Sequence, residues 1–388
     1  MGGQQGYSKI TTNGLVFAYD TGDQRNAYAG EPTTNLANFD IASSGFSSDT
    51  PGNVTQTANS SEATYRGRLS RKMVVGAGYW NAYIYNYNTG VSSTKFAVSY
   101  KVKTANGAHP STIIGGGYIY GSAGNFFPAP TFTYLNDGWY LATMLYSGTS
   151  MTLSSITGMN GYGPGVFYII DYQAEAKDHS TPFTPSGTTR SNTQGLLDIS
   201  GTGTSINLAN VSFNANAQYY FDGTDDYINL GMISAGMAGA SQATMELVIN
   251  MTFPSSLQQI FGFRDDNQFD FFFLVFAGGG SEFRVRNSAG TYYDLNPNLS
   301  SYAGKSTHIV FCVGPEGRKV YANGVLIASN ATWTGNLAGV SPFNIGRNAS
   351  NMWFATGTMP VAKLYTKQLT ANEVLQNYNH YKTRFNIA

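Results

Sequence analysis

A strand that opens a β-sandwich and then breaks off is the feature that most constrains the fold of this chain. Residues 13–36 read NGLVFAYDTGDQRNAYAGEPTTNL. In this run Leu15, Phe17 and Tyr19 alternate with residues of the opposite face, as in a strand that has one side buried. A turn-forming Asp-Thr-Gly-Asp run follows, and the composition then changes. The segments that complete the sandwich must therefore lie elsewhere in the chain.

Suitable segments lie in the second half of the chain. The run ATMELVIN (243–250) alternates between apolar and other residues, and THIVFCVG (307–314) is typical of a buried central strand. The pair 323–324, Asn-Gly, stands between two apolar runs and predicts a hairpin. Near the end, Thr370 and Glu373 have the spacing of a capping box and predict a short C-terminal helix.

The part of the chain between these sandwich segments has a different amino-acid composition. It contains tyrosine-rich strands such as YWNAYIYNYN and GWYLATMLYSG, and it ends in the proline- and hydroxyl-rich run KDHSTPFTPSGTTRS, which predicts an extended linker. A domain can be inserted where the interrupted ends of its host lie close together at an exposed loop. We therefore expect an all-β chain with a discontinuous sandwich (13–33 and 191–388), an inserted β-domain (34–190) and an N-terminal arm (1–12).

The composition argues against some partners and favours an exterior location. The 22 basic and 22 acidic residues cancel, which leaves no electrostatic footprint for nucleic acid or an anionic membrane. Charged residues make up only 11% of the chain, as suits neutral surfaces of extracellular or virion proteins. The N-terminus MGGQQGYSKI lacks the pattern of a signal peptide, and no apolar run is long enough to span a membrane. A protein suited to an exterior but made in the host cytoplasm without an export signal needs another way out, and release by cell lysis inside a virus particle is one.

Several stretches support a family resemblance. GLVFAYDTGDQ, LLDISGTGTSINLAN, YYFDGTDDYINLG and the ending VAKLYTKQLTANEVLQNYNHYKTRF resemble the laminin G-like, concanavalin A-like sandwich of phage structural proteins. YAGEPTTNL is similar to virion proteins of marine phages, cyanophages among them. The middle domain, with DGWYLATMLYS, resembles jelly-roll modules of the carbohydrate-binding type. The resemblance implies a concanavalin A-like β-sandwich with an inserted jelly-roll-like β-sandwich, and a structural or adhesive role on a virion.

Three aspartates in FDGTDDYI are a candidate metal site. Asp222, Asp225 and Asp226 lie close together, and hard cations such as calcium bind clustered oxygen ligands. The alternative is a turn, because Asp-Gly favours left-handed backbone geometry and aspartates bond nearby amides. The spacing lacks the ligand order of a known calcium loop, so we favour the turn and expect no cofactor beyond a structural calcium ion at most.

Aromatic residues crowd the middle domain and are candidates for binding carbohydrate. Sugars stack their C–H faces on exposed rings, and neighbouring amides and carboxylates bond the hydroxyls. The alternative is packing in the core or between subunits. Strand alternation puts Tyr83, Tyr85 and Tyr87 on one face, but it does not say whether that face points outward. The candidate carbohydrate-binding residues are Trp80, Tyr83, Tyr85, Tyr87, Trp139 and Tyr140.

We find no constellation of catalytic residues. Asp265 and Asp266 are adjacent, so in a strand they point to opposite faces and form a poor pair for glycoside hydrolysis. The four histidines are scattered, without the spacing of a zinc site. We therefore expect a protein that is not an enzyme.

The leading hypothesis is a non-enzymatic phage virion surface protein, in a capsid decoration, fibre, or neck or tail appendage. Such a protein would contact other virion proteins and itself, as a homo-oligomer. The alternative is a host-recognition lectin in a tail or head fibre, which would bind cell-surface polysaccharide through the aromatic residues of the middle domain.

Overall fold

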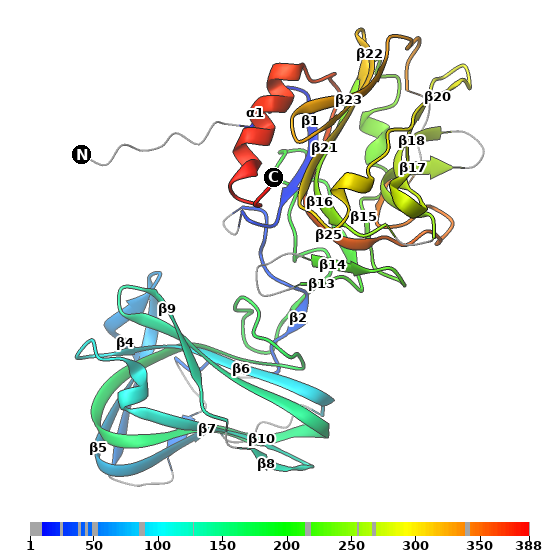
Figure 1. Cartoon of the computed structure of the whole chain (residues 1–388). Helices are drawn as coiled ribbons and strands as arrows, with labels where there is room; N and C mark the ends of the chain where they lie inside the picture. Colours follow the sequence, from blue (N-terminus) through cyan, green and yellow to red (C-terminus); the bar gives the residue numbers. More distant parts are fainter. Residues whose placement is uncertain are drawn as a thin grey trace, which may run out of the picture. The chain divides into compact units, whose positions relative to one another are not determined.

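The computed structural model of the chain (Figure 1) describes residues 10–23, 26–37, 40–42, 46–48, 53–84, 90–126, 128–213, 219–253, 256–265, 269–337 and 342–387. It divides into two compact units. The sandwich unit comprises Met1–Glu31 and Asn192–Ala388, and the inserted unit comprises Pro32–Ser191. Each unit has its own hydrophobic core.

The first sheet of the sandwich unit has eight antiparallel strands. In spatial order they are β13 (Ser212–Phe213), β14 (Tyr219–Asp222), β25 (Thr356–Tyr365), β16 (Ala243–Met251), β21 (Thr307–Gly314), β22 (Gly317–Ala322) and β23 (Val325–Asn330), with β1 (Leu15–Asp20) paired to β25. Leu15 lies opposite Tyr365, and Asp20 lies opposite Val361. The opening strand of the chain is therefore hydrogen-bonded to the last strand before the C-terminal helix.

The second sheet of the sandwich unit has seven strands, also antiparallel. In spatial order they are β12 (Asn207–Ala209), β15 (Tyr227–Asn229), β24 (Asn344–Ile345), β17 (Gln258–Asp265), β18 (Phe269–Val275), β19 (Ser281–Arg286) and β20 (Tyr292–Leu295). Short 3-10 turns lie between some of the strands of this unit: η2 (Ile233–Gly236), η3 (Ala277–Gly279) and η4 (Ser300–Tyr302).

The core of the sandwich unit lies between these two sheets and is rich in phenylalanine. The ring of Phe271, from the seven-stranded sheet, stacks on Phe311 of the eight-stranded sheet with centroids 5.5 Å apart. Phe273 and Phe283 stack within the seven-stranded sheet at 4.2 Å. Complete burial of each such side chain stabilises the fold by about 1.5–3 kcal/mol. The apolar residues of the alternating strands therefore define the inner faces of the two sheets.

Two predicted local elements, a hairpin turn and a helix cap, are present in the structure. Asn323 and Gly324 both have positive φ angles, 51° and 77°, and connect β22 to β23 in a tight hairpin. Helix α1 (Ala371–Lys382) begins with a complete capping box: the Thr370 hydroxyl accepts from the Glu373 N–H, and the Glu373 carboxylate accepts from the Thr370 N–H. These elements confirm the predicted hairpin and the predicted short C-terminal helix.

A buried polar network lies on the outer face of the eight-stranded sheet, where α1 packs. Glu246 of β16 is completely buried. Its Oε1 lies 2.8 Å from His308 Nε2, and its Oε2 accepts from Tyr365 Oη at 2.8 Å and from Asn377 Nδ2 of α1 at 2.9 Å. The Lys363 ammonium completes the group at 3.3 Å. The network therefore ties the helix to β16, β21 and β25.

The main sheet of the inserted unit has eight strands and curls on itself. Its strands are β3 (Phe46–Ser48), β4 (Val54–Tyr65), β5 (Arg68–Ile84), β6 (Ser92–Thr104), β7 (Ile114–Gly121), β8 (Gly124–Phe126), β9 (Thr131–Asn136) and β10 (Trp139–Glu175); η1 (Pro110–Thr112) precedes β7. The first part of β10 and its last part both pair with β6. A strand of 37 residues can return to the same neighbour only by bending, so the sheet forms a half-barrel.

Glycine permits this bend where the strands approach most closely. A Cβ atom at Gly161 would collide with the carbonyl oxygen of Ile113, and one at Gly163 would collide with the carbonyl oxygen of Gly76. Side chains on the inner side of the curl, among them Trp80, Phe167 and Met159, form the core of the unit. The absence of a side chain at two positions of β10 thus allows the sheet to close around its core.

The two ends of the inserted unit lie side by side. The short strands β2 (Thr33–Thr34) and β11 (Thr189–Arg190) pair with each other. Within the sandwich unit, Tyr28 likewise forms an antiparallel bridge with Leu196. The chain thus leaves and re-enters the sandwich unit through adjacent segments, which is the geometry that an insertion requires.

The strands and the single described α-helix confirm the all-β prediction. Among the helices that the structure describes, none has the length and apolar character needed to cross a membrane.

Candidate functional site

A cross-strand row of outward-facing residues runs over the whole seven-stranded sheet. It is adjacent to the buried row that contains Phe261, Phe273 and Phe283, and successive residues of a strand point to opposite faces. In register from edge to edge, its members are Asn207, Asn229, Asn344, Gly262, Phe272, Arg284 and Asp294. In the middle of this row Phe272 and Asn344 are buried, so the row presents amide groups to solvent at one end and charged groups at the other.

A shallow pocket of about 530 Å³ lies at the charged end of this row. Its lining includes Glu282 and Arg284 of β19, Asp294 of β20, and the amide side chains of Asn296 and Asn298 in the loop that follows. We call it the Arg284 pocket. Glutamate, arginine, aspartate and asparagine side chains, all with planar polar groups, thus line one pocket at the edge of the sheet.

Arg284 organises the pocket. Its Nε and Nη2 donate to the two carboxylate oxygens of Asp294 at 2.8 and 2.9 Å, and Nη2 also lies 2.6 Å from Glu282 Oε1. The two parallel hydrogen bonds fix the orientation of the Asp294 carboxylate, and Glu282 forms an ion pair with the same guanidinium. With one positive and two negative groups, the three side chains leave a net negative charge, and the carboxylate oxygens keep lone pairs that can accept hydrogen bonds from hydroxyls.

An exposed aromatic ring borders the pocket. Tyr292 lies directly opposite Arg286 on the neighbouring strand, and the guanidinium groups of Arg284 and Arg286 each lie 4.9 Å from the centre of its ring. The side chain of Tyr292 is 47% exposed. The two arginines hold the ring in place while part of its surface faces solvent.

A second shallow pocket, of about 430 Å³, lies at the opposite end of the row. Hydroxyl and amide side chains line it, including Thr204, Ser205, Asn207 and Asn229. The Asn229 Oδ1 accepts from the Gly231 N–H at 2.7 Å, which orients its amide. This end of the face has no charged lining residue, in contrast with the Arg284 pocket.

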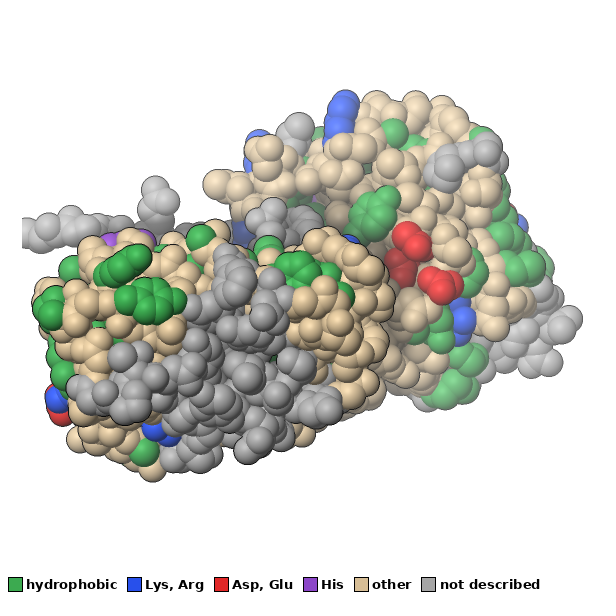
Figure 2. Space-filling model, turned by 90° about the horizontal axis from the view of Figure 1, so that it is seen from below, with side chains coloured by type: hydrophobic (Ala, Val, Ile, Leu, Met, Phe, Trp, Pro, Cys, Tyr) green, Lys and Arg blue, Asp and Glu red, His purple; other side chains and the backbone are tan. Residues whose placement is uncertain are grey.

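The structure brings the three predicted metal-binding aspartates together. One carboxylate oxygen from each of Asp222, Asp225 and Asp226 lies within 4.8 Å of the others, and Figure 2 shows acidic side chains gathered on this unit. The same side chains build a turn: Asp222 Oδ1 accepts from the Thr224 N–H at 2.7 Å, and Asp226 Oδ2 accepts from the Asp222 N–H at 2.8 Å. The donor set suits calcium chemically, but the backbone already uses two of the three carboxylates.

Burial, together with the charges of Asp222 and Asp225, raises the pKa of Asp226 to about 6. The hydrogen bond from the Asp222 N–H opposes this shift. A raised pKa means that the folded state holds a proton on Asp226 more tightly than the unfolded chain does. The turn is therefore electrostatically strained near neutral pH.

Two of the predicted carbohydrate-binding residues are buried. Trp80 is 0% exposed and packs on Phe167 with ring centroids 5.5 Å apart, and Trp139 is 1% exposed beside Tyr65. Neither indole face can stack on a sugar, so the structure corrects the sequence-based assignment of these two residues. The physical reason is the curl of the sheet: alternation fixes which residues share a face, and only the curl decides which face lies inside.

The tyrosines of the same prediction fall in different places. Tyr140 is half-buried between His109 and Tyr134, whose ring centroids lie 4.9 and 5.3 Å away. Tyr83 lies in β5 opposite Gly158, but its side chain is not among those described. Tyr85 and Tyr87 lie outside the described residues, so the structure neither supports nor opposes their assignment.

Sequence reasoning missed the residues of the Arg284 pocket and three exposed tyrosines. The alternation in SEFRVR, with Phe283 and Val285 inside, already puts Arg284 on the outer face. The sequence pattern does not reveal the strand register that places Asp294 opposite Arg284. These three tyrosines, Tyr79, Tyr134 and Tyr162, are the exposed ones among the described side chains of the inserted unit.

Comparison with protein families gives one match. Residues 222–375 match a family described as the concanavalin A-like lectin/glucanases superfamily. The matched segment contains all of the Arg284 pocket and most strands of both sandwich sheets. A comparison with curated proteins found no match.

Comparison with solved structures gives toxin binding domains among the most similar. The receptor-binding domain of botulinum neurotoxin D has 15% identity and a TM-score of 0.41 over 48% of this chain and 50% of that one. A neurotoxin D ligand-binding domain in complex with N-acetylneuraminic acid has 15% identity and a TM-score of 0.39, over 48% of each chain. The binding domain of Paraclostridial Mosquitocidal Protein 1 has 15% identity and a TM-score of 0.37, over 48% and 49%. This chain thus spans about half the length of these proteins.

The two packed antiparallel sheets and the family match agree on the architecture of this segment. Residues 222–375 form a concanavalin A-like lectin/glucanase domain.

Proposed function

We propose that this protein is a non-catalytic glycan-binding protein and that the Arg284 pocket binds sugar hydroxyls. The supporting observation is the position of the pocket: planar carboxylate, guanidinium and amide groups converge beside an exposed tyrosine, within a domain whose superfamily includes lectins. Bidentate polar side chains match pairs of neighbouring hydroxyls, and a ring face matches the C–H face of a sugar.

The arrangement of the carboxylates favours binding over hydrolysis. Glycoside hydrolysis uses two carboxyl groups on opposite sides of the scissile bond, of which one must donate a proton. In the Arg284 pocket, Glu282 and Asp294 both bond the same guanidinium. Because both carboxylates are paired with Arg284, they are suited to accept hydrogen bonds from hydroxyl groups rather than to donate a proton.

The test is binding of the full chain to a glycan array that holds uncharged and sialylated oligosaccharides. Sialylated probes are included because one of the similar structures was determined with N-acetylneuraminic acid. Asp294→Asn keeps the shape of the side chain but weakens its bond to Arg284, and should reduce binding to the recognised glycan by about tenfold, which corresponds to about 1.4 kcal/mol. The matched control is Glu316→Gln, which removes an exposed, ion-paired carboxylate elsewhere on the same unit.

Two outcomes would contradict the proposal. One is an array on which the wild-type chain binds no glycan. The other is glycan binding that Asp294→Asn and Tyr292→Ala leave unchanged. Release of reducing ends from a bound polysaccharide would contradict the non-catalytic part alone.

The location of the protein is a separate matter. The sequence resemblance to phage structural proteins predicts a virion surface and contacts with other virion proteins, and these stay predictions. Labelling intact virions with an antibody against the chain would test them, whatever the glycan array shows.

A further inference from the structure

The inserted unit exposes an aromatic and amide cluster that the sequence analysis did not identify. In β5, Trp80 and Ala82 point into the core, so their neighbours Tyr79 and Asn81 face outward. On the adjacent strand β10, Gly161 lies opposite Trp80, so Tyr162 and Asn160 face outward as well. We call Tyr79, Asn81, Asn160 and Tyr162 the tyrosine–asparagine cluster.

The cluster consists of two matched cross-strand pairs. Tyr79 lies directly opposite Tyr162, and Asn81 lies directly opposite Asn160 in the next outward row. The two rings meet edge to face, with centroids 5.7 Å apart and an interplanar angle of 69°. Asn160 Nδ2 donates to the Tyr79 hydroxyl at 2.8 Å and joins the two pairs diagonally.

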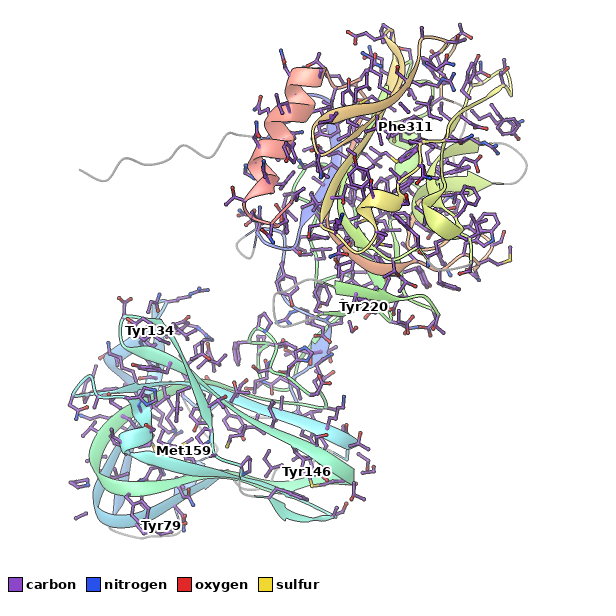
Figure 3. The ribbon with its side chains drawn as sticks, viewed as in Figure 1. Tyr79, Tyr134, Tyr146, Met159, Tyr220 and Phe311 are labelled. Atoms are coloured by element: carbon purple, nitrogen blue, oxygen red, sulfur yellow. The ribbon has the colours of Figure 1, made fainter. Side chains whose placement is uncertain are left out.

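The rings of the cluster are accessible. Tyr162 is 69% exposed and Tyr79 is 45% exposed, although large aromatic side chains usually bury their surface. In Figure 3, Tyr79 lies at the periphery of the inserted unit, away from Met159 between the strands. Since neither ring serves the core, their exposure calls for another explanation.

The cluster rests on a rigid base. Trp80, whose side chain points inward between Tyr79 and Asn81, is completely buried against Phe167. On the other side of β10, Gly116 lies opposite Asn160, and a Cβ atom there would come within 2.5 Å of Asn160 Oδ1. Glycine at this position leaves room for the amide to lie over the strand. The buried Trp80 and the hydrogen bond between Asn160 and Tyr79 therefore orient this part of the cluster before any ligand arrives.

We propose that the tyrosine–asparagine cluster is a second binding site, for an uncharged oligosaccharide. None of its four side chains has a charge, so it offers nothing to compensate a phosphate, sulfate or carboxylate. Two ring surfaces can stack on the C–H faces of sugar rings. Two amides beside them can each donate and accept hydrogen bonds, as hydroxyls require.

The two asparagines, Asn81 and Asn160, favour a glycan over an apolar peptide as the ligand. A hydrophobic partner would cover Asn81 and Asn160 and would have to satisfy their donors and acceptors, at a cost of about 1–3 kcal/mol for each group left unpaired. Sugar hydroxyls can both donate to and accept from these amides, as water does. The inference goes beyond the proposed function because it places a separate site on another unit with a different chemical preference.

The experiment uses the full chain on an array of uncharged oligosaccharides built from glucose, galactose, mannose or N-acetylglucosamine, followed by calorimetric titration with the best of them. Tyr162→Ala and Asn160→Ala should each weaken binding of that oligosaccharide about tenfold or more. Tyr162→Phe should retain most of the affinity because it keeps the ring. The matched control is Tyr134→Ala, which removes a tyrosine that is 60% exposed on another strand of the same unit.

The Asp294→Asn variant separates this inference from the proposed function. If the cluster is a site of its own, one oligosaccharide loses affinity in Tyr162→Ala and keeps it in Asp294→Asn. That result supports the cluster even if the Arg284 pocket binds nothing. The inference is overturned if no uncharged oligosaccharide binds, if Tyr162→Ala binds every oligosaccharide as the wild type does, or if Tyr134→Ala reduces affinity equally. Unchanged melting temperatures of the variants would show that they are folded.

Discussion

The sandwich unit and the inserted unit differ in what surrounds their buried charges and in the chemistry of their proposed sites. The sandwich unit buries its phenylalanines between two sheets and also buries charge, in the Glu246 network beneath the helix. The inserted unit buries two tryptophans but leaves Tyr79 and Tyr162 on its outer surface, beside amides. The proposed site of the first unit is charged, and that of the second is neutral.

The difference follows from the architecture of the units. A sandwich has two outer faces, and one of them can be covered by a helix, so charged residues such as Glu246 and Lys363 become completely buried. The main sheet of the inserted unit curls around its own core, and none of the described elements covers its outer face where Tyr79 and Tyr162 lie. The buried carboxylates therefore have different surroundings: Asn377 of the covering helix bonds Glu246, whereas Thr33 and Thr181 bond Glu175 of the inserted unit.

The largest effect is expected from the core of the inserted unit. Trp80→Ala should reduce the free energy of unfolding of this unit by about 4 kcal/mol, because it removes a fully buried indole and leaves a cavity. Chemical denaturation monitored by fluorescence would measure it. Tyr162→Ala, on the adjacent strand but on the outer face, should change stability by no more than about 0.5 kcal/mol. Equal losses in the two variants would contradict the assignment of inner and outer faces.

The next effect concerns the buried charge of the sandwich unit. Glu246→Gln should reduce the free energy of unfolding of this unit by about 3 kcal/mol, because it leaves the buried Lys363 ammonium without its carboxylate. Differential scanning calorimetry would measure the shift. The control is Glu62→Gln in the inserted unit, which breaks an exposed pair with Lys72 and should leave the stability nearly unchanged.

The same carboxylate predicts a pH dependence. Burial alone would raise the pKa of Glu246, but the Lys363 ammonium, His308 and the Tyr365 hydroxyl outweigh it and lower the pKa from 4.5 to about 2. The folded state thus favours the ionised form. Its contribution to stability is fully present above about pH 4.5 and is lost as the pH falls through about 2. Melting curves between pH 7 and 2 should therefore show a steeper acid loss in the wild type than in Glu246→Gln.

The smallest effect has the opposite sign. Because the pKa of Asp226 is raised to about 6, its ionisation destabilises the sandwich unit as the pH rises from about 4 through 6. Asp226→Asn should therefore raise the free energy of unfolding at pH 7.5 by about 1 kcal/mol, a value reduced because solvent screens part of the charge. At pH 4 the substitution should change the free energy of unfolding little. Thermal melts at the two pH values would measure it. If calcium stabilises the wild type at pH 7.5 and Asp226→Asn abolishes that effect, the carboxylates form a metal site rather than a turn alone.

Local signals made several elements predictable. The Thr370–Glu373 capping box, the Asn323-Gly324 hairpin and the alternating apolar residues of β16 act within a few residues of each other, so one sequence suffices to recognise them. The three aspartates were recognisable for the same reason, because they lie within five residues. The Arg284 pocket was not, because its residues meet through the pairing of β19 with β20.

The aromatic prediction shows where pattern reasoning stops. Alternation correctly groups Trp80 with Ala82 and separates both from Tyr79, but it is symmetric with respect to inside and outside. The large apolar ring of Trp80 suits it to stacking on a sugar, but the same apolar surface also suits it to the core, where it lies.

The sequence by itself determined the β class, the turns, the helix cap and the pairs of residues that share a face, since these depend on contacts between near neighbours. Tertiary structure alone decided which face is inside, which carboxylates meet Arg284 and which tyrosines reach solvent. The physical reason is that strand register and sheet curvature are set by the packing of the whole core, to which each short segment contributes only a part.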